Sequence, residues 1–344
     1  MSRFDFGGSV SCDITADALH EAALKCNKVW GVAPDLAFIL SKLEELYPER
    51  CIDNIDSELV AINIAAELAR KGQRPYVVDK IPFLTMRAFE QIRNEISYQN
   101  LPVTIIGFGD GLIPTSGSIE NCIEDISLMR TLINMSVVSV SDPNMIRSFI
   151  QQSLDLNNPL YIRQADGNSG RFIYNTEKTN YPIGKGLVAR KGKDLTIITH
   201  GVLVASALEA AELVAEAEID IRVIDMYSIK PLDTELIIKA IKETSSIIVV
   251  EDHLKRGGLS SAVAELIVDE GVFPEHIIRM GIPDVIPDII ALCDSDEMLR
   301  DKCSFGTKAI VRKIREFVWP RGSEWDWTHL DKHHDKHQCI LHDT

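Results

Sequence analysis

Residues 75–106, PYVVDKIPFLTMRAFEQIRNEISYQNLPVTII, decide the fold of the first half of this chain. Short β-rich runs at 75–78 and 103–106 flank a stretch, 83–96, whose apolar residues follow a helical period. Two strands joined by such a helix lie parallel in one sheet, with the helix covering a face. The stretch therefore predicts an α/β domain with a mostly parallel, doubly wound sheet.

The same alternation continues on both sides and restarts after a polar, glycine-rich segment. We expect an N-terminal arm at 1–14, an α/β domain at 15–180, a linker at 181–193, a smaller α/β domain at 194–318 and a His/Trp-rich tail at 319–344. The other expected elements of the first domain are strands 137–140 and 160–162 and helices 59–70 and 120–132. Those of the second domain are strands 195–198, 221–225, 247–251 and 276–280 and helices 202–215, 234–244, 259–269 and 307–317.

The composition limits the classes of partner. With 344 residues, 45% hydrophobic and 25% charged, the chain is apolar enough to bury two cores. Its net charge of -15 disfavours nucleic acid and anionic membranes. The seven cysteines include no C-x-x-C pair, and we find no signal segment and no apolar run of about 18 residues. We therefore expect a cytoplasmic protein with reduced cysteines.

Glu58 stands at the expected start of a helix, in the segment YPERCIDNIDSELVAINIAAELARKGQRPYV at 47–77. The residues alone indicate a helix N-terminus, where Asp56, Ser57 and Glu58 cap free N–H groups and the dipole favours negative charge.

The segment also resembles the transketolase and 1-deoxyxylulose-5-phosphate synthase motif R-F-F-D-x-G-I-A-E-Q-x-x-x-x-x-A-A-G-L-A. In that family the matching glutamate hydrogen-bonds N1′ of the aminopyrimidine of thiamine diphosphate and activates the cofactor by a proton relay. The resemblance implies this catalytic and cofactor-binding role for Glu58. The matching residues are Arg50, Asp53, Glu58, Ala65, Ala66, Leu68 and Ala69.

The next segment, KIPFLTMRAFEQIRNEISYQNLPV, is similar to the family's Y-S-T-F-L-Q-R-A-Y-D-Q-I…L-Q-N-L-P-V. Phe83, Met86 and Phe89 recur every three residues, so we expect them on one helical face. Such a stripe is typical of core packing. The resemblance implies that these residues also form the apolar pocket of the aminopyrimidine ring, with the first aromatic stacked on it.

The tripeptide Gly109-Asp110-Gly111 matches the start of the G-D-G…N motif that ligates Mg²⁺ and diphosphate, with Asn134 as the downstream candidate. Asn134 comes too early, and the order of segments places the tripeptide in the pyrimidine-binding domain, so we interpret the match as chance. No metal ligand is then expected in this chain. The resemblance implies that an N-terminal transketolase-like subunit supplies the Mg²⁺ and diphosphate site, in a heterotetramer where this chain also dimerises.

The expected substrate contacts differ from the family pattern. GLIPTSGSIENCIEDISLMR aligns with G-L-T-G-E-D-G-P-T-H-Q-A-V-E-D-L-A-L-L-R, which places Ser116 on an acidic position and Glu120 on a substrate-contacting histidine. These changes indicate a specialised substrate. Arg163 matches an arginine that binds a substrate phosphate in the family, and a surface ion pair is the alternative.

The second domain resembles the family's C-terminal domain in GKGLVARKGKDLTIITHGVLVASALEAAELV, IRVIDMYSIKPLD and VVEDHLKRGGLSSAVAE. We expect structural roles for His200, His253 and the Gly257-Gly258 turn. The spacing of His329, His333 and His337 permits a metal site on a helix, although an exposed polar tail is the simpler interpretation.

The resemblance implies a two-component enzyme that transfers a ketol or acyl unit from a ketose or 2-oxo donor to an acceptor. Two alternatives remain open. One is an E1β-like 2-oxoacid decarboxylase subunit that passes an acyl unit to a carrier protein, and the other is a non-catalytic assembly or regulatory subunit.

Overall fold

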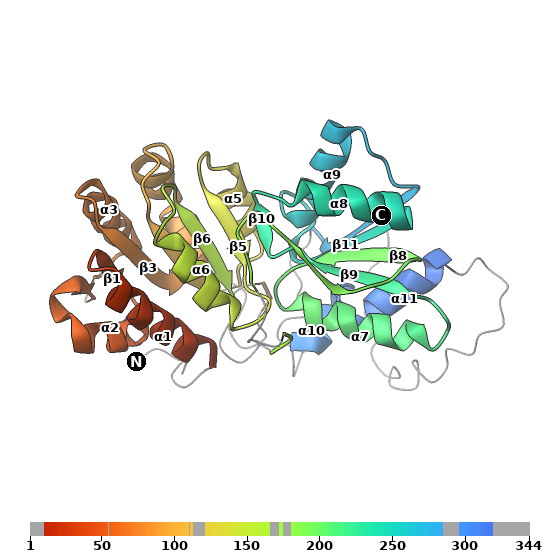
Figure 1. Cartoon of the computed structure of the whole chain (residues 1–344), viewed down its shortest axis with the longest axis horizontal. Helices are drawn as coiled ribbons and strands as arrows, with labels where there is room; N and C mark the ends of the chain where they lie inside the picture. The colour runs from red at the N-terminus through yellow and green to blue at the C-terminus, as the bar shows by residue number, and fades with distance from the viewer. Residues whose placement is uncertain are drawn as a thin grey trace.

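The computed structural model describes residues 10–53, 55–109, 111–112, 121–165, 172–174, 180–284 and 296–318. It contains two α/β domains that lie side by side, the first coloured red to yellow and the second green to blue in Figure 1. Each domain is built on one sheet whose strand pairs are parallel except at one edge. The predicted fold class is confirmed.

The first domain contains a seven-stranded sheet in the order β10-β5-β6-β4-β3-β1-β2. Its strands are β1 (Val29–Val32), β2 (Cys51–Ile52), β3 (Arg74–Lys80), β4 (Thr104–Phe108), β5 (Ser136–Ser139), β6 (Leu160–Gln164) and β10 (Ser228–Lys230). Its α-helices are α1 (Val10–Lys25), α2 (Ser41–Leu46), α3 (Glu58–Arg70), α4 (Phe89–Gln91), α5 (Asp125–Thr131) and α6 (Met145–Ser153). Short helical turns are η1 (Ala37–Leu40), η2 (Pro48–Arg50), η3 (Phe83–Arg87) and η4 (Ile92–Ser97).

The second domain contains a five-stranded sheet in the order β12-β11-β8-β9-β7. Its strands are β7 (Leu187–Arg190), β8 (Leu195–Thr199), β9 (Ile221–Asp225), β11 (Ser246–Leu254) and β12 (His276–Ile282). Its helices are α7 (Leu203–Ala215), α8 (Thr234–Thr244), α9 (Leu259–Glu270), α10 (Asp296–Lys302) and α11 (Thr307–Val318). None of the helices in the described part of the chain has the length and apolar character needed to cross a membrane.

Three elements differ from the expected organisation. Helix α1 begins at Val10, inside the segment expected to be an arm, and strand β7 lies inside the expected linker. Strand β10 belongs in sequence to the second domain but pairs antiparallel with β5 of the first. Strands β7 and β10 are only four and three residues long, so their pairing depends on tertiary contacts that a local pattern does not show.

Helix α3 is held close to the first sheet by small side chains. Ala61, Ala65, Ala66 and Ala69 are buried along one face, in the same core as Val77 of β3. Alanines allow the helix backbone to approach the strands closely. This packing fixes the N-terminus of α3, and therefore Glu58, against the first sheet.

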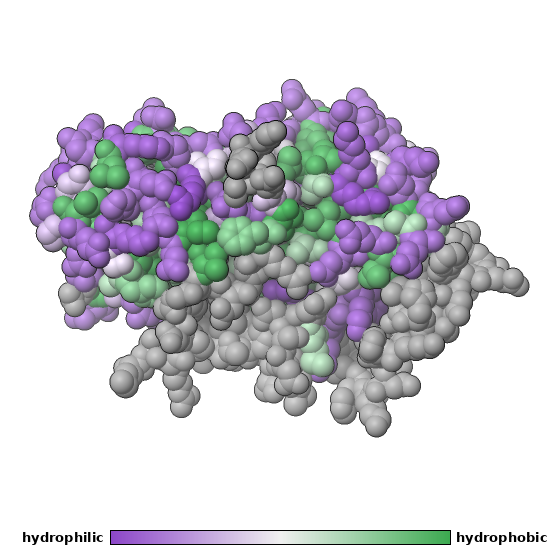
Figure 2. Space-filling model, turned by 60° about the horizontal axis from the view of Figure 1, so that its bottom comes forward, coloured by the Kyte–Doolittle hydropathy of each residue, from purple (hydrophilic) through white to green (hydrophobic). Residues whose placement is uncertain are grey.

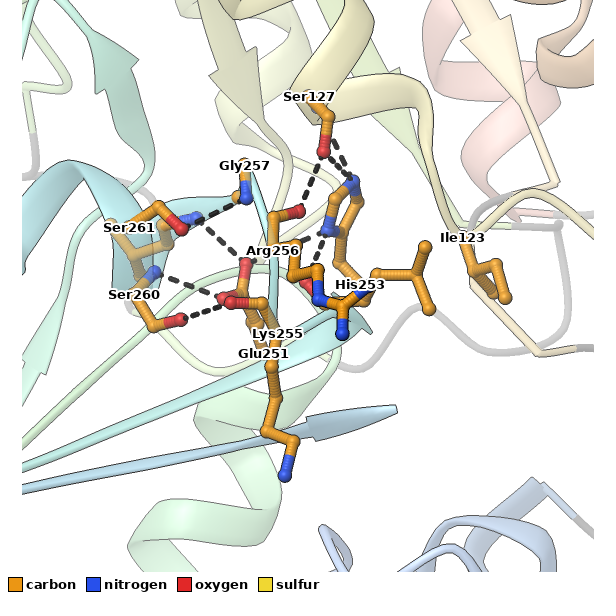
Figure 3. A network of polar contacts seen from close by, with 12 residues as sticks. Ile123, Ser127, Glu251, His253, Lys255, Arg256, Gly257, Ser260 and Ser261 are labelled. Carbon is orange, nitrogen blue, oxygen red and sulfur yellow. Dashed lines mark hydrogen bonds and ion pairs between the residues drawn. The ribbon is translucent and has the colours of Figure 1, made fainter. Parts of the chain in front are cut away.

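The two domains meet through a buried polar network between β11, α9 and α5 (Figure 3). The Glu251 carboxylate accepts hydrogen bonds from the backbone N–H groups of Leu259, at 2.7 Å, and Ser260, at 3.0 Å, which lie in the first turn of α9. Beside it, Nε2 of His253 lies 3.3 Å from the backbone nitrogen of Ser127 in the first domain. A carboxylate at a helix N-terminus and an interdomain hydrogen bond together stabilise this junction.

The Gly257-Gly258 turn leaves the space that this network needs. A Cβ on Gly258 would lie 1.9 Å from Oε2 of Glu251 and 2.7 Å from Nδ1 of His253. Gly257 has a φ of +76°, and its N–H donates to the hydroxyl of Ser261 at 2.8 Å (Figure 3). These contacts agree with the structural roles expected for His253 and the turn.

Candidate functional site

Glu58 is the first residue of α3, and its side chain is almost fully buried, with 7% of the residue exposed. The residue before it, Ser57, has extended backbone angles, and its side chain makes no capping hydrogen bond. The expected capping by Ser57 is therefore absent, while the acidic Glu58 does stand in the first helical turn.

Arg87 pairs with the Glu58 carboxylate. Its Nη1 atom donates to both oxygens, at 3.1 Å to Oε1 and 3.0 Å to Oε2. The guanidinium carbon also lies 4.6 Å from the centre of the Phe83 ring, within the range of a cation–π contact. Arg87 therefore contacts both Glu58 and Phe83, the two residues to which the family resemblance gives cofactor-binding roles.

The helix that carries Phe83 is not a regular α-helix. It consists of two π-helical turns, η3 and η4, on either side of the short helix α4. The family motif quoted above has F-L-Q-R where this chain has Phe83-Leu-Thr-Met-Arg87, one residue more. A π turn, whose hydrogen bonds span five residues, accommodates the extra residue.

The π turns change which residues share a face. The buried face carries Leu84, Ala88 and Ile92, whereas Met86 is 38% exposed. Phe83 and Phe89 are half-buried, and Phe89 packs against the apolar core between α3 and the first sheet. The three residues therefore differ in exposure, and their shared role in the pocket of the aminopyrimidine ring stays a prediction.

Asp79 lies near Glu58 at the carboxyl end of β3, a central strand of the first sheet. It is fully buried, and its Oδ1 accepts a hydrogen bond from the backbone N–H of Lys80 at 2.7 Å. Its Oδ2 has no hydrogen-bond partner among the described residues. Burial raises the pKa of Asp79 to about 7, and the charges of Glu58 and Asp35 act in the same direction. Lys80 pairs with Asp35 at 3.2 Å.

The raised pKa of Asp79 predicts a pH-dependent stability. Because the pKa is about 7 in the folded protein and 3.8 ordinarily, protonation favours the folded state. Its contribution is fully present below about pH 4 and is lost as the pH rises through 7, by an amount on the order of a few kcal/mol. Urea unfolding of Asp79→Asn should show a smaller loss between pH 4 and pH 8 than the wild type.

The exposed Asp155 provides the control for that comparison, since Asp155→Asn alters a carboxyl group without changing a buried one. A wild-type pH dependence that Asp79→Asn leaves intact would show that Asp79 is ionised in the folded protein at neutral pH.

Arg163 lies in β6 and is fully buried, so neither a surface ion pair nor an accessible anion ligand describes it in this structure. Its Nε donates to Oδ2 of Asp125 at 2.9 Å, and its Nη2 donates to the carbonyl oxygen of Asp252 at 2.9 Å. Tyr161 donates to the same Asp125 oxygen at 2.8 Å. The guanidinium therefore joins the first domain to β11 of the second.

The structure describes some of the remaining candidate residues, and the others lie outside the described residues. Asn134 has a left-handed φ of 61°, and its amide donates to the carbonyl of Ser97 at 3.0 Å, which fits a turn residue. Gly111 has a φ of +66°, and a Cβ there would lie 2.3 Å from the Asp252 carboxylate. Ser116, Glu120, Asp110 and the tail histidines lie outside the described residues.

His200, the other histidine expected to be structural, is buried at the end of β8. Its Nδ1 lies 3.0 Å from the Ser139 hydroxyl in β5, and burial lowers its pKa well below the usual value. No group of three or more histidine, cysteine, aspartate or glutamate side chains in the described ranges could hold a metal ion.

The described part of the candidate site consists of Glu58, Arg87, Phe83 and Asp79, with Lys80 beside them.

Sequence reasoning missed Arg87 and Asp79. The signal for Arg87 was the extra residue between Phe83 and the arginine, and the signal for Asp79 was a carboxylate at the end of an apolar strand run. Neither signal reports proximity to Glu58 by itself. The pairing with Arg87 depends on how η3 lies against α3, and the proximity of Asp79 depends on how α3 lies against β3.

Comparison with known proteins places this site in a family. Residues 12–170 match the family described as "Transketolase, pyrimidine binding domain", and residues 184–294 match "Transketolase, C-terminal domain". The 1-deoxy-D-xylulose-5-phosphate synthase 1 of Geobacter sulfurreducens is 33% identical over 281 residues, which cover 81% of this chain and 44% of that protein. The synthase of Heliobacterium modesticaldum is 32% identical over 274 residues, or 79% of this chain and 42% of that protein. The chain therefore spans less than half the length of these relatives.

Solved structures agree with the sequence matches. A structure titled "Split gene transketolase, inactive beta4 tetramer" aligns with a TM-score of 0.80 and 31% identity, covering 90% of this chain and 98% of that chain. The transketolase of Campylobacter jejuni aligns with a TM-score of 0.69 over 92% of this chain and 48% of its own, at 17% identity, and shares the fold. The chain belongs to the transketolase and 1-deoxyxylulose-5-phosphate synthase family of thiamine-diphosphate enzymes, and it corresponds to their C-terminal half.

Proposed function

We propose that this chain supplies the pyrimidine side of the thiamine-diphosphate site in a two-component, transketolase-like transferase. The enzyme moves a ketol or acyl unit from a ketose or 2-oxo donor to an acceptor. The observation that carries the proposal is the group formed by Glu58, Arg87 and Phe83. A planar N–H donor already lies on the Phe83 ring and hydrogen-bonds the Glu58 carboxylate, as a protonated aminopyrimidine requires.

The residues therefore fit the cofactor's pyrimidine ring. Glu58 would hold the proton at ring nitrogen N1′, Phe83 would offer its face, and Met86 and Phe89 would supply apolar contacts. The burial of Glu58, whose side chain is 9% exposed, strengthens its hydrogen bonds. When bound, thiamine diphosphate supplies the thiazolium carbon with which the enzyme cleaves a C–C bond beside a carbonyl.

A partner subunit is part of the proposal. The diphosphate and Mg²⁺ need hard oxygen ligands and phosphate-facing N–H groups, and we assign these to an N-terminal transketolase-like chain. The similar chain that is titled a split gene transketolase supports this division. We propose two copies of each subunit, with this chain also contacting its own copy.

Exposed apolar side chains near Glu58 support the proposal of a partner subunit. Val60 is 50% exposed two residues after Glu58. Met86 is exposed in η3, and Tyr98 is exposed directly after η4. On one face of the molecule, apolar side chains also gather in a band across the middle (Figure 2). Apolar surface of this kind is buried when subunits associate.

The proposal also specifies the type of reaction, the donor and the cellular compartment. The relatives and solved structures reported above are named as transketolases or 1-deoxy-D-xylulose-5-phosphate synthases, which supports a ketol or acyl transfer over an E1β-like decarboxylation. Ser116 and Glu120, as substrate contacts, would select a specialised donor. We place the enzyme in the cytoplasm, which accords with the absence of disulfides at Cys26, Cys51 and Cys122.

Calorimetric titration with thiamine diphosphate and Mg²⁺ tests the proposal. The samples are this chain, a candidate partner that carries a G-D-G…N segment, and an equimolar mixture of the two. We expect high affinity only in the mixture, because each chain holds one end of the cofactor. A mixture that forms a stable complex yet binds no cofactor would exclude the proposed function.

A further inference from the structure

Arg87 makes two contacts at once. One nitrogen of its guanidinium donates to both oxygens of Glu58, and its carbon lies 4.6 Å from the centre of the Phe83 ring. These are the hydrogen-bond acceptor and the stacking surface that the cofactor's pyrimidine needs. Arg87 therefore makes the contacts with Glu58 and Phe83 that the proposed function assigns to the pyrimidine ring.

The exposure of the two side chains differs. The Arg87 side chain is 55% exposed, whereas that of Glu58 is 9% exposed. Arg87 can therefore rotate away from Glu58 into solvent without burying its charge. Glu58, in contrast, is held at the N-terminus of α3. The long, flexible arginine is the member of the pair that moves.

The surroundings of Glu58 explain why the pair forms. The buried Asp79 lies near Glu58, and Lys80, the residue after it, is paired with Asp35. A nearly buried carboxylate is stabilised by contact with a cation. Arg87 is the cation that contacts it.

The extra residue places the guanidinium over the ring. Arg87 follows Phe83 by four residues within η3, and a π turn holds this spacing on neighbouring positions of the helix surface. Residues four apart are also neighbours on a regular α-helix, so the contact follows from the local sequence.

We propose that Arg87 occupies the pyrimidine position when no cofactor is bound, and that cofactor binding displaces it into solvent. This inference rests on the proposed function. Arg87 then acts as a competitor that holds the Glu58 side chain in place. The apparent affinity for thiamine diphosphate equals the intrinsic affinity multiplied by the fraction of molecules in which the pair is open.

The expected effect follows from the strength of the contacts. Exposed ion pairs and cation–π contacts together correspond to about a 3- to 30-fold change in an equilibrium constant. Arg87→Met, which keeps the length of the side chain and removes its charge, should tighten binding of thiamine diphosphate to the two-chain complex by about that factor. Arg87→Lys, which keeps the charge and removes the planar stack, should give a smaller gain.

Arg93 provides a matched control. It lies on the same helical segment, and its guanidinium carbon is 4.3 Å from the centre of the Tyr98 ring, but its side-chain hydrogen bonds go to Asn94 and Tyr98. Arg93→Met therefore removes an arginine–aromatic contact of the same kind and should leave cofactor affinity within about twofold of the wild type.

The experiment is calorimetric titration of the four complexes with thiamine diphosphate and Mg²⁺ at low and high NaCl concentration, about 50 mM and about 500 mM. The advantage of Arg87→Met over the wild type should shrink at high salt, because salt weakens the Arg87–Glu58 pair. Equal or weaker binding by Arg87→Met, with normal binding by the wild type, would overturn the competitor role alone. No binding by a well-assembled wild-type complex would overturn both this role and the proposed function.

Discussion

Replacing Glu58 by glutamine should lower kcat of the two-chain enzyme by about 100- to 10,000-fold for every donor that it accepts, the range of a lost general acid–base group. Glutamine has nearly the same shape as glutamate but cannot exchange a proton with a ring nitrogen. The loss should not depend on the donor, because cofactor activation precedes donor binding. KM should change much less than kcat.

Steady-state kinetics with several ketose and 2-oxo donors provides the measurement. Glu67→Gln, on the exposed side of the same helix, is the control, and it should retain wild-type kcat. A loss with Glu58→Gln that appears with one donor and not with others would assign Glu58 to substrate binding instead of cofactor activation.

Breaking the buried Arg163–Asp125 pair should cost about 3 to 5 kcal/mol of unfolding free energy. Both side chains are fully buried, with an Nε–Oδ2 distance of 2.9 Å. Asp125→Ala leaves a guanidinium in the interior without its acidic partner, and Arg163→Met leaves a carboxylate without its cation. Removing the two charges together in Asp125→Leu/Arg163→Met should cost less than either single change.

Urea unfolding of the wild type, the two single variants and the double variant measures this coupling. If both single variants unfold within about 1 kcal/mol of the wild type, the buried pair does not stabilise the fold. Arg163 would then be available for the anion-binding role that the family resemblance implied.

Local signals determined which elements could be predicted closely. Strand β9 (Ile221–Asp225) and helix α8 (Thr234–Thr244) have the expected bounds, since α8 begins after the capping Asp233 and ends at the left-handed Ser245. Helix α1 was not predicted, because its buried face consists largely of alanine, serine, threonine and cysteine. Such residues give a weak hydrophobic period.

The residues of the candidate site also differ in how far local sequence could predict them. Glu58 could be placed at a helix start from the sequence, because the signal lies within a few residues. Its pairing with Arg87 depends on a π turn, and its proximity to Asp79 depends on how α3 packs against β3. Contacts between distant segments follow from packing, which the pattern of a single segment does not specify.

Hydrogen–deuterium exchange at C2 of bound thiamine diphosphate tests the central claim most directly, because it reports cofactor activation without a known donor. We predict that exchange in the wild-type complex of this chain with its partner is at least about 100-fold faster than in the same complex carrying Glu58→Gln. Equal exchange rates in the two complexes, with cofactor bound in both, would contradict the assignment of Glu58 as the residue that activates the cofactor.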